Sequence, residues 1–146
     1  MTSSRMRGFT LIELVVVITI LGILAAFAIP RFVSLETQAR VSSLNGLTGG
    51  LRSGASLARA MAMAQGNNPA SILMEGQSIS LTNSYPTVAS ISQTLQDTSG
   101  FTVTVGAAST TFSPTGASNA ATCITTYAPP AAAGSAPTIT VDTSGC

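Results

Sequence analysis

The side chains that could do chemistry in this chain are few. Its 146 residues include no histidine and no lysine, although serine and threonine are abundant. Histidine and lysine supply the commonest general base, the Schiff-base amine and the commonest metal ligand. Without them, a serine hydroxyl has no nearby group of the usual kind to activate it. The composition therefore argues against an enzyme, and we expect no cofactor.

Metal binding and nucleic-acid binding are also poorly supported by the residue types. Beyond Arg59 the only charged residues are Glu75, Asp97 and Asp142. These three acids are far apart in the sequence, so only chance would bring them together as a carboxylate pair or a calcium site. We therefore predict no metal site. The six basic residues are all arginine, and they are scattered without interleaved aromatic side chains. No nucleic-acid partner is predicted from this pattern.

Two cysteines, Cys123 and Cys146, lie far beyond an apolar N-terminal segment. If that segment crosses or targets a membrane, both thiols reach an oxidising compartment, where disulfides persist. In the chain-entropy model, closing a loop of this length stabilises the fold by about 3.4 kcal/mol. Two free thiols or an intermolecular bridge are the alternatives. We predict the intramolecular disulfide.

Glu13 is the charged residue whose position asks for a specific explanation. It is the only ionisable residue in the apolar run of 21 residues from Phe9 to Ile29. As a helix this run is about 31 Å long, close to one bilayer core. Three interpretations are open: a secretory signal cleaved after the A-x-A box at residues 26–28, a permanent anchor, or an anchor that later becomes an interior element of an assembly.

The cost of burying Glu13 favours the third interpretation. A charge within an inserted helix costs about 2.5–3.5 kcal/mol, and neither a signal nor a plain anchor uses it. If the chain is cut between Gly8 and Phe9, the new α-amine lies four residues before Glu13 on one helical face. It could then meet the carboxylate of its own chain or of an adjacent subunit. Burying such a pair costs much less than burying either charge alone.

The residues around this proposed cut resemble a known family. RGFTLIEL at 7–14, followed by VVVITILGILAAFAIPRF, resembles the leader and N-terminal helix of type IV pilins, particularly the type IVa class. The resemblance is strong over residues 5 to about 45. It implies that a membrane prepilin peptidase cuts between Gly8 and Phe9 and that Phe9 is then N-methylated. Glu13 matches the glutamate five residues into the mature chain.

Three further stretches are similar to one pilin subfamily, the mannose-sensitive haemagglutinin pilins. They are PRFVSLETQARVSSLNGL, EGQSISLTNSYP and the segment APTITVDTSGC. These stretches are shorter than the N-terminal match. They indicate a surface fibre used in adhesion.

Gly22 and Pro30 are the other predicted assembly positions. Gly22 and Ala26 form a small-xxx-small pair, which allows helices to approach closely in lipid, although a generic anchor could also contain it. Pro30 cannot donate to the carbonyl of Ala26, so we expect a kink or local opening there. The pilin resemblance implies that helix is lost between Gly22 and Pro30 when subunits pack in a filament.

The pattern from Arg31 to about Gln65 predicts an amphipathic helix that ends at GNNP (66–69). Four glycines weaken this helix, and we expect them to let strands come close. The expected buried positions are Val41, Leu44, Leu51, Ala55, Ala58 and Ala62.

The remaining sequence predicts short strands and one short helix. A hairpin over residues 71–81 should turn at Glu75-Gly76. The helix is expected within 88–96. Strands are expected at 101–105, 123–128 and 138–142 from their β-branched content, with a long hairpin loop between the last two. Residues 106–121 are low in complexity and are expected to form an exposed loop, with at most one irregular strand.

Together these elements predict an α+β protein, with a long N-terminal helix packed on a small antiparallel sheet. The expected divisions are a leader (1–8), an apolar transmembrane or filament-core helix (9–30), an amphipathic helix (31–66) and a β-rich head with a C-terminal disulfide region (67–146).

The leading functional hypothesis is a pilus subunit that polymerises through its N-terminal helix for adhesion or motility. A helical polymer needs contacts between different faces of successive copies. The implied partners are other copies of the chain, the prepilin peptidase and methyltransferase, and the inner-membrane assembly machinery. The implied location is a single pass through the inner membrane with a cytoplasmic N-terminus, and then the extracellular pilus.

Two alternatives remain open. A pseudopilin of a type II secretion system carries the same leader, but usually has acidic calcium-binding loops near its C-terminus, where this chain has only Asp142 and two cysteines. A membrane-anchored periplasmic binding domain has no need of Glu13.

Overall fold

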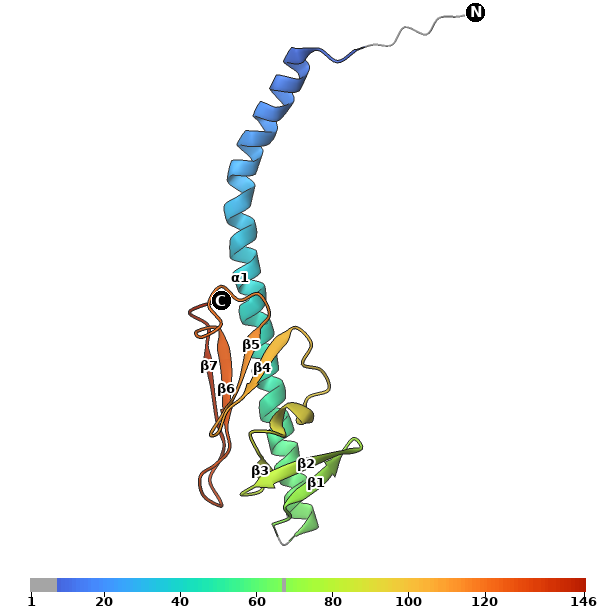
Figure 1. Ribbon diagram of the computed structural model, residues 1–146, viewed down its shortest axis with the longest axis vertical. Coiled ribbons are helices and arrows are strands. Elements are labelled where there is room, and N and C mark those ends of the chain that lie inside the picture. The colour runs from blue at the N-terminus through green and yellow to red at the C-terminus, as the bar shows by residue number, and fades with distance from the viewer. Residues whose placement is uncertain (1–7, 67) are drawn as a thin grey trace, which may run out of the picture. The chain divides into compact units, whose positions relative to one another are not determined.

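The computed structural model describes residues 8–66 and 68–146, and its contacts divide the chain into two compact units, Met1–Thr37 and Gln38–Cys146. The predicted leader therefore lies outside the described residues except for Gly8. One α-helix, one short 3₁₀ helix and seven strands are described and are shown in Figure 1. They are α1 (Leu11–Gln65), β1 (Ser71–Met74), β2 (Gln77–Thr82), β3 (Tyr85–Pro86), the short 3₁₀ helix η1 (Ile91–Thr94), β4 (Phe101–Val105), β5 (Thr110–Pro114), β6 (Ile124–Ala128) and β7 (Thr138–Asp142).

Within the first unit, α1 continues through Pro30 without a break. The kink or opening expected there is therefore not seen as an interruption of the helix. A proline removes a single backbone hydrogen bond, and a long helix can absorb that loss by bending gently. Gly66, with a φ of 69°, follows the last helical residue and adopts the left-handed conformation that commonly ends helices, as GNNP predicts.

In the second unit, the C-terminal part of α1 lies against the two sheets (Figure 1). Its buried side chains form a stripe along the helix. The predicted positions are buried, except that Val41 is only half-buried. Leu47 and Thr48 also belong to this stripe, although the helical pattern did not mark them. The full buried set is Leu44, Leu47, Thr48, Leu51, Gly54, Ala55, Ala58 and Ala62.

The glycines of α1 do not all serve the purpose expected of them. A Cβ on Gly54 would lie 2.5 Å from Thr94 Oγ1, and one on Gly50 would lie 3.0 Å from a methyl carbon of Leu95. Thr94 is the last residue of η1 and Leu95 follows it, so neither neighbour belongs to a strand. A Cβ on Gly46 or Gly49 would meet nothing within 4 Å. Close approach therefore explains two of the four glycines, and it involves η1.

The first sheet is antiparallel in the order β1-β2-β3. Glu75 and Gly76 have φ values of 47° and 84°, the left-handed pair that a two-residue hairpin turn requires. The turn predicted at these two residues is therefore confirmed. Ile72, Met74 and Ile79 pack against the alanines of α1 in a small apolar cluster.

The second sheet is an antiparallel meander in the order β4-β5-β6-β7. The predicted strands at 101–105 and 138–142 are confirmed, and β6 begins one residue later than predicted. The prediction of an exposed loop with at most one irregular strand over 106–121 holds on both sides of β5, but β5 itself is a regular and largely buried strand. β5 pairs with both β4 and β6, and Phe112 is completely buried. Pairing on both edges and the burial of one aromatic ring outweigh the weak local pattern of small polar residues.

Two other expectations about the head need adjusting. The helix expected within 88–96 is limited to η1, a single 3₁₀ turn with Ile91 fully buried. The head also contains two sheets where one was expected. The sheets are joined by Tyr127, whose buried hydroxyl donates to the carbonyl of Pro86 at 2.7 Å. The fold is α+β, as predicted, with one long helix packed on small antiparallel sheets.

Candidate processing and assembly segment

Thr10 and Glu13 form a reciprocal cap at the start of α1. The backbone N–H and the Oγ1 hydroxyl of Thr10 both donate to Glu13 Oε2, at 3.0 and 2.8 Å. The N–H of Glu13 donates back to Thr10 Oγ1 at 3.3 Å. This is a capping box, which satisfies N–H groups that the first turn of a helix leaves without partners. Its signal, Thr-x-x-Glu, is visible in the sequence but was not used in the predictions above.

The capping box gives Glu13 a partner within its own chain. Before any cleavage Phe9 is joined to Gly8, so it has an amide and no free α-amine. Phe9 and Glu13 nevertheless line one shallow hollow together with Ile12, Val16 and Val17. Phe9 lies outside the helix, and 84% of it is exposed. The geometry therefore brings the two predicted residues to one face, while their pairing as amine and carboxylate stays a prediction.

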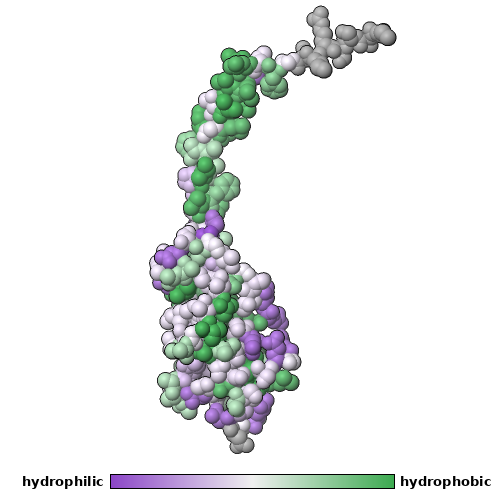
Figure 2. All heavy atoms as spheres, viewed as in Figure 1, coloured by the Kyte–Doolittle hydropathy of each residue, from purple (hydrophilic) through white to green (hydrophobic). Residues whose placement is uncertain are grey.

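The surface of α1 in the first unit is almost entirely apolar and exposed. Every large hydrophobic side chain from Phe9 to Leu35 is at least 45% exposed. Figure 2 shows this part of α1 as a nearly continuous apolar surface. The hydroxyls that interrupt it bond to the helix itself: Thr19 Oγ1 donates to the carbonyl of Val15 at 2.7 Å. Among the described residues, α1 is long and apolar enough to cross a membrane, by length and composition.

Gly22 and Pro30 lie on this exposed surface, away from the capping box along the helix. A Cβ on Gly22 would meet nothing within 4 Å, so no packing within the chain explains this glycine. Pro30 is likewise exposed. The chain itself does not bring Glu13, Gly22 and Pro30 into one site. Their roles in contacts between copies remain predictions.

The predicted disulfide is present in the second unit. Cys123 and Cys146 are joined, and both are buried against Leu44 of α1. Arg40 Nη1 donates to the carbonyl of Cys146 at 3.0 Å. The backbone N–H of Asn119 donates to the carbonyl of Gly145 at 3.0 Å. The disulfide and these bonds fix the segment after β7 to α1 and to the loop before β6.

The described residues offer no assembled centre for metal chemistry. No group of three or more histidine, cysteine or acidic side chains among them is placed to hold a metal ion. Instead, the carboxylate of Asp97 accepts a hydrogen bond from the Ser99 hydroxyl, and that of Asp142 accepts one from the Ser144 hydroxyl.

Comparison with known families decides how the N-terminal segment is classified. Residues 3–29 match the family model described as the prokaryotic N-terminal methylation motif. The chain is 47% identical over 58 residues to the type IV narrow pilus major component PilA5 of Thermus thermophilus. Over these matched residues it is homologous to type IV pilins. The match covers 40% of this chain and 50% of PilA5.

Other relatives support the same homology over shorter stretches. The type IV major pilin protein PilA of Myxococcus xanthus is 55% identical over 38 residues, 26% of this chain and 17% of that protein. The type IV major fimbrial protein FimA of Dichelobacter nodosus is 47% identical over 49 residues, 34% of this chain and 31% of FimA. The chain thus matches at most half the length of these relatives. No solved structure matches it. Membership of the mannose-sensitive haemagglutinin subfamily stays a prediction.

Proposed function

We propose that this chain is the structural subunit of a type IV pilus. The observation that carries the proposal is the methylation motif over residues 3–29, joined to an apolar helix whose side chains are exposed in the single chain. An apolar surface of this extent must be covered by lipid or by other copies of the chain. The three relatives described above are named as pilus or fimbrial components.

The proposed pathway begins with the leader in the cytoplasm and α1 in the inner membrane. Prepilin peptidase removes residues 1–8 and the same enzyme methylates Phe9. Residues 9–30 then pass from lipid into the filament core, with Gly22 and Pro30 at contacts between copies, while residues 31–66 and 67–146 form the outer layer. The inner-membrane assembly machinery would carry out this transfer. Adhesion or motility is the proposed use of the fibre.

Glu13 has two successive partners in this proposal. Thr10 holds the carboxylate before assembly, as the capping box supports. After cleavage, the α-amine of Phe9 on the same or an adjacent copy would neutralise it. A buried charge pair with complete hydrogen bonding costs much less than one buried charge.

The type II secretion pseudopilin is the alternative with the same leader. The buried Cys123–Cys146 disulfide supports a pilin, as does the lack, among the described residues, of an acidic cluster placed for calcium. A pseudopilin would share the processing chemistry, so processing alone cannot separate the two. Recovery from the outer surface can.

The first test is the intact mass and N-terminal sequence of the protein recovered by shearing cells. We expect a chain that begins at Phe9 and carries one additional methyl group. It should also lack the two thiol hydrogens that are lost when the disulfide forms. Glu13→Gln is the matched variant, because it keeps the shape of the side chain and removes its charge. We expect it to be processed but absent from the sheared fraction.

Each other outcome points to a specific alternative. A chain that begins at Ile29 would identify residues 26–28 as a secretory cleavage box. An uncut chain confined to membranes would indicate a plain anchor. A processed chain that stays with the cell body would favour the pseudopilin.

A further inference from the structure

The second unit has few charged residues, and most of its positive and negative side chains lie on different sides of α1. Residues 38–146 carry three arginines and three acids. Arg40 lies at the disulfide, and Asp142 lies at the end of β7. The other four occupy two different flanks of α1, with Arg52 and Arg59 on one and the acids Glu75 and Asp97 on the other.

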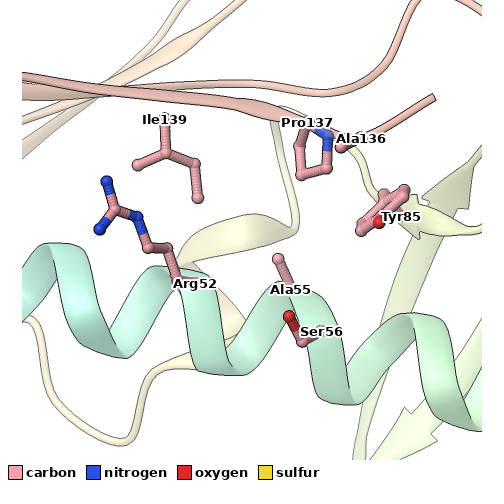
Figure 3. A pocket seen from close by; sticks show the side chains of 7 residues that line it. All are labelled: Arg52, Ala55, Ser56, Tyr85, Ala136, Pro137 and Ile139. Atoms are coloured by element: carbon pink, nitrogen blue, oxygen red, sulfur yellow. The ribbon is translucent and has the colours of Figure 1, made fainter.

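The arginine flank consists of Arg52, Arg59 and Tyr85. Arg52 lines a cleft of about 250 Å³ between α1 and β7, with Tyr85 at its far end (Figure 3). The Arg52 side chain is exposed, and no hydrogen bond or ion pair joins it to any described residue. Arg59 lies two helical turns further on, where its Nη1 donates to the Tyr85 hydroxyl at 2.5 Å and its guanidinium lies 4.9 Å from the ring centre.

The acidic flank consists of Glu75 and Asp97, which line a second cleft of about 480 Å³. The α1 residues that line this cleft include Gly46 and Gly50, which have no side chains to fill it. Glu75 is exposed at the tip of the β1–β2 turn. Hydrogen bonds from Ser99 lower the pKa of Asp97, so its exposed carboxylate is charged at neutral pH.

The two flanks lie on different sides of the helix. The α1 residues that line the first cleft and those that line the second do not overlap. At 3.6 residues per turn, their mean directions differ by roughly 160° about the helix axis. A contact between two copies of the same flank would place like charges together, which is unfavourable. A contact between unlike flanks is attractive, and repeating it generates an open polymer instead of a closed dimer.

We propose that the arginine flank of one copy binds the acidic flank of the next copy in the filament, with Arg52 facing Glu75. The contact deepens the proposed function, on which it rests, by naming the surface through which neighbouring heads meet. Arg59 and Asp97 add charge of the same sign to the two flanks. The partner is therefore a second copy of this chain.

Charge reversal tests the contact directly. Arg52→Glu and Glu75→Arg should each reduce the fraction of subunit recovered as sheared filament by about tenfold, because each places like charges in a repeated interface. The double variant, Arg52→Glu with Glu75→Arg, should restore most of the yield by exchanging the two charges. Arg52→Lys is the matched control and should assemble like the original chain.

Folding can be separated from assembly in these variants. Arg52 and Glu75 are exposed, so we expect normal amounts of processed, disulfide-bonded subunit in the membrane for every variant. Cysteines at the same two positions should also crosslink successive copies. A non-reducing gel of sheared filaments from the double cysteine variant should show a ladder of multimers.

The possible failures are distinguishable. Full filament yield from Arg52→Glu, or a charge exchange no better than the worse single variant, would overturn the proposed contact while leaving the pilus subunit in place. Filaments without a multimer ladder would overturn it in the same way. Absence of sheared filaments from the original chain would overturn the proposed function and this contact with it.

Discussion

At the scale of single residues, hydrogen-bonded hydroxyls supply much of the specificity that charges supply in other proteins. Thr48 Oγ1 lies 2.8 Å from Thr125 Oγ1 in the buried contact between α1 and β6. Thr10 caps α1, and Ser90 Oγ donates to the carbonyl of Ser80 at 2.7 Å. A hydroxyl costs less to bury than a charge when its hydrogen bonds are complete. The scarcity of charged residues is therefore compatible with a uniquely packed head.

Gly54 and Gly49 form a matched pair for testing close packing. A Cβ on Gly54 would lie 2.9 Å from Thr94 Cβ, and the Thr94 hydroxyl is held by its bond to the carbonyl of Ile91 at 2.7 Å. We expect Gly54→Ala to lower the free energy of unfolding by about 1–2 kcal/mol, because overpacking exceeds the gain in helix propensity.

Gly49→Ala should have the opposite sign. Nothing lies within 4 Å of its Cβ, so the variant should gain about 0.5–1 kcal/mol from helix propensity alone. Thermal unfolding of the two full-length variants in the same detergent measures the difference. Equal stability of both variants would contradict the close contact between α1 and η1.

At the scale of elements, sequence patterns located those parts of the fold that local chemistry determines. The β1–β2 turn could be predicted because Glu75-Gly76 separates two runs with alternating apolar residues, and β4 and β7 followed from their β-branched content. β5 was not located because its own residues give a weak local pattern, and the burial of Phe112 depends on pairing with both β4 and β6. The capping box also follows from local chemistry, because Thr10-x-x-Glu13 stands at the start of the apolar run.

The same distinction between local sequence and tertiary packing applies to the candidate site. A motif of consecutive residues indicated the processing segment, and the structure adds the Thr10 cap and the shared hollow of Phe9 and Glu13. The two charged flanks could not be predicted in this way. Arg52 and Glu75 come from α1 and from a turn that approach only in the folded head, so their arrangement depends on tertiary packing.

The disulfide makes a testable contribution to the β6–β7 region. It links residues 23 positions apart, and the chain-entropy model gives about 3.4 kcal/mol for a loop of this size. Replacing both cysteines by alanine should lower the free energy of unfolding by about 3 kcal/mol and speed hydrogen exchange after β7. Reductant should destabilise the original chain similarly and leave the double variant unchanged. Stability that is unaffected by either treatment would show that the hydrogen bonds of Arg40 and Asn119 suffice.

At the scale of the whole molecule, the second unit contains a core of its own. Its three apolar clusters draw only on residues from Val41 onward. We therefore expect a fragment of residues 38–146, exported to an oxidising compartment, to be soluble, folded and monomeric. Dispersed amide signals in a two-dimensional NMR spectrum would show this, and a collapsed spectrum would contradict it.

A shorter fragment provides the control for that experiment. A chain of residues 49–146 retains both sheets but loses Leu44, Leu47 and Thr48, which are all buried in the second unit. Losing two buried leucines costs several kcal/mol, a large part of the stability of a small domain. We expect this fragment to be unfolded or strongly destabilised. If it matched the longer fragment, the α1 residues before position 49 would not be part of the folding unit.

The cap at Thr10 also bears on how a protease would meet this chain. α1 begins at Leu11, and Gly8 and Phe9 precede it as exposed, non-helical backbone. A protease must draw its substrate into an extended conformation, and a bond inside a helix would first have to unwind. Because the Thr10 cap starts the helix just after the proposed cut, the Gly8–Phe9 bond lies in non-helical backbone while the helix that follows is already formed. The same hydroxyl that completes the first turn thus separates a cleavable stretch from a durable one.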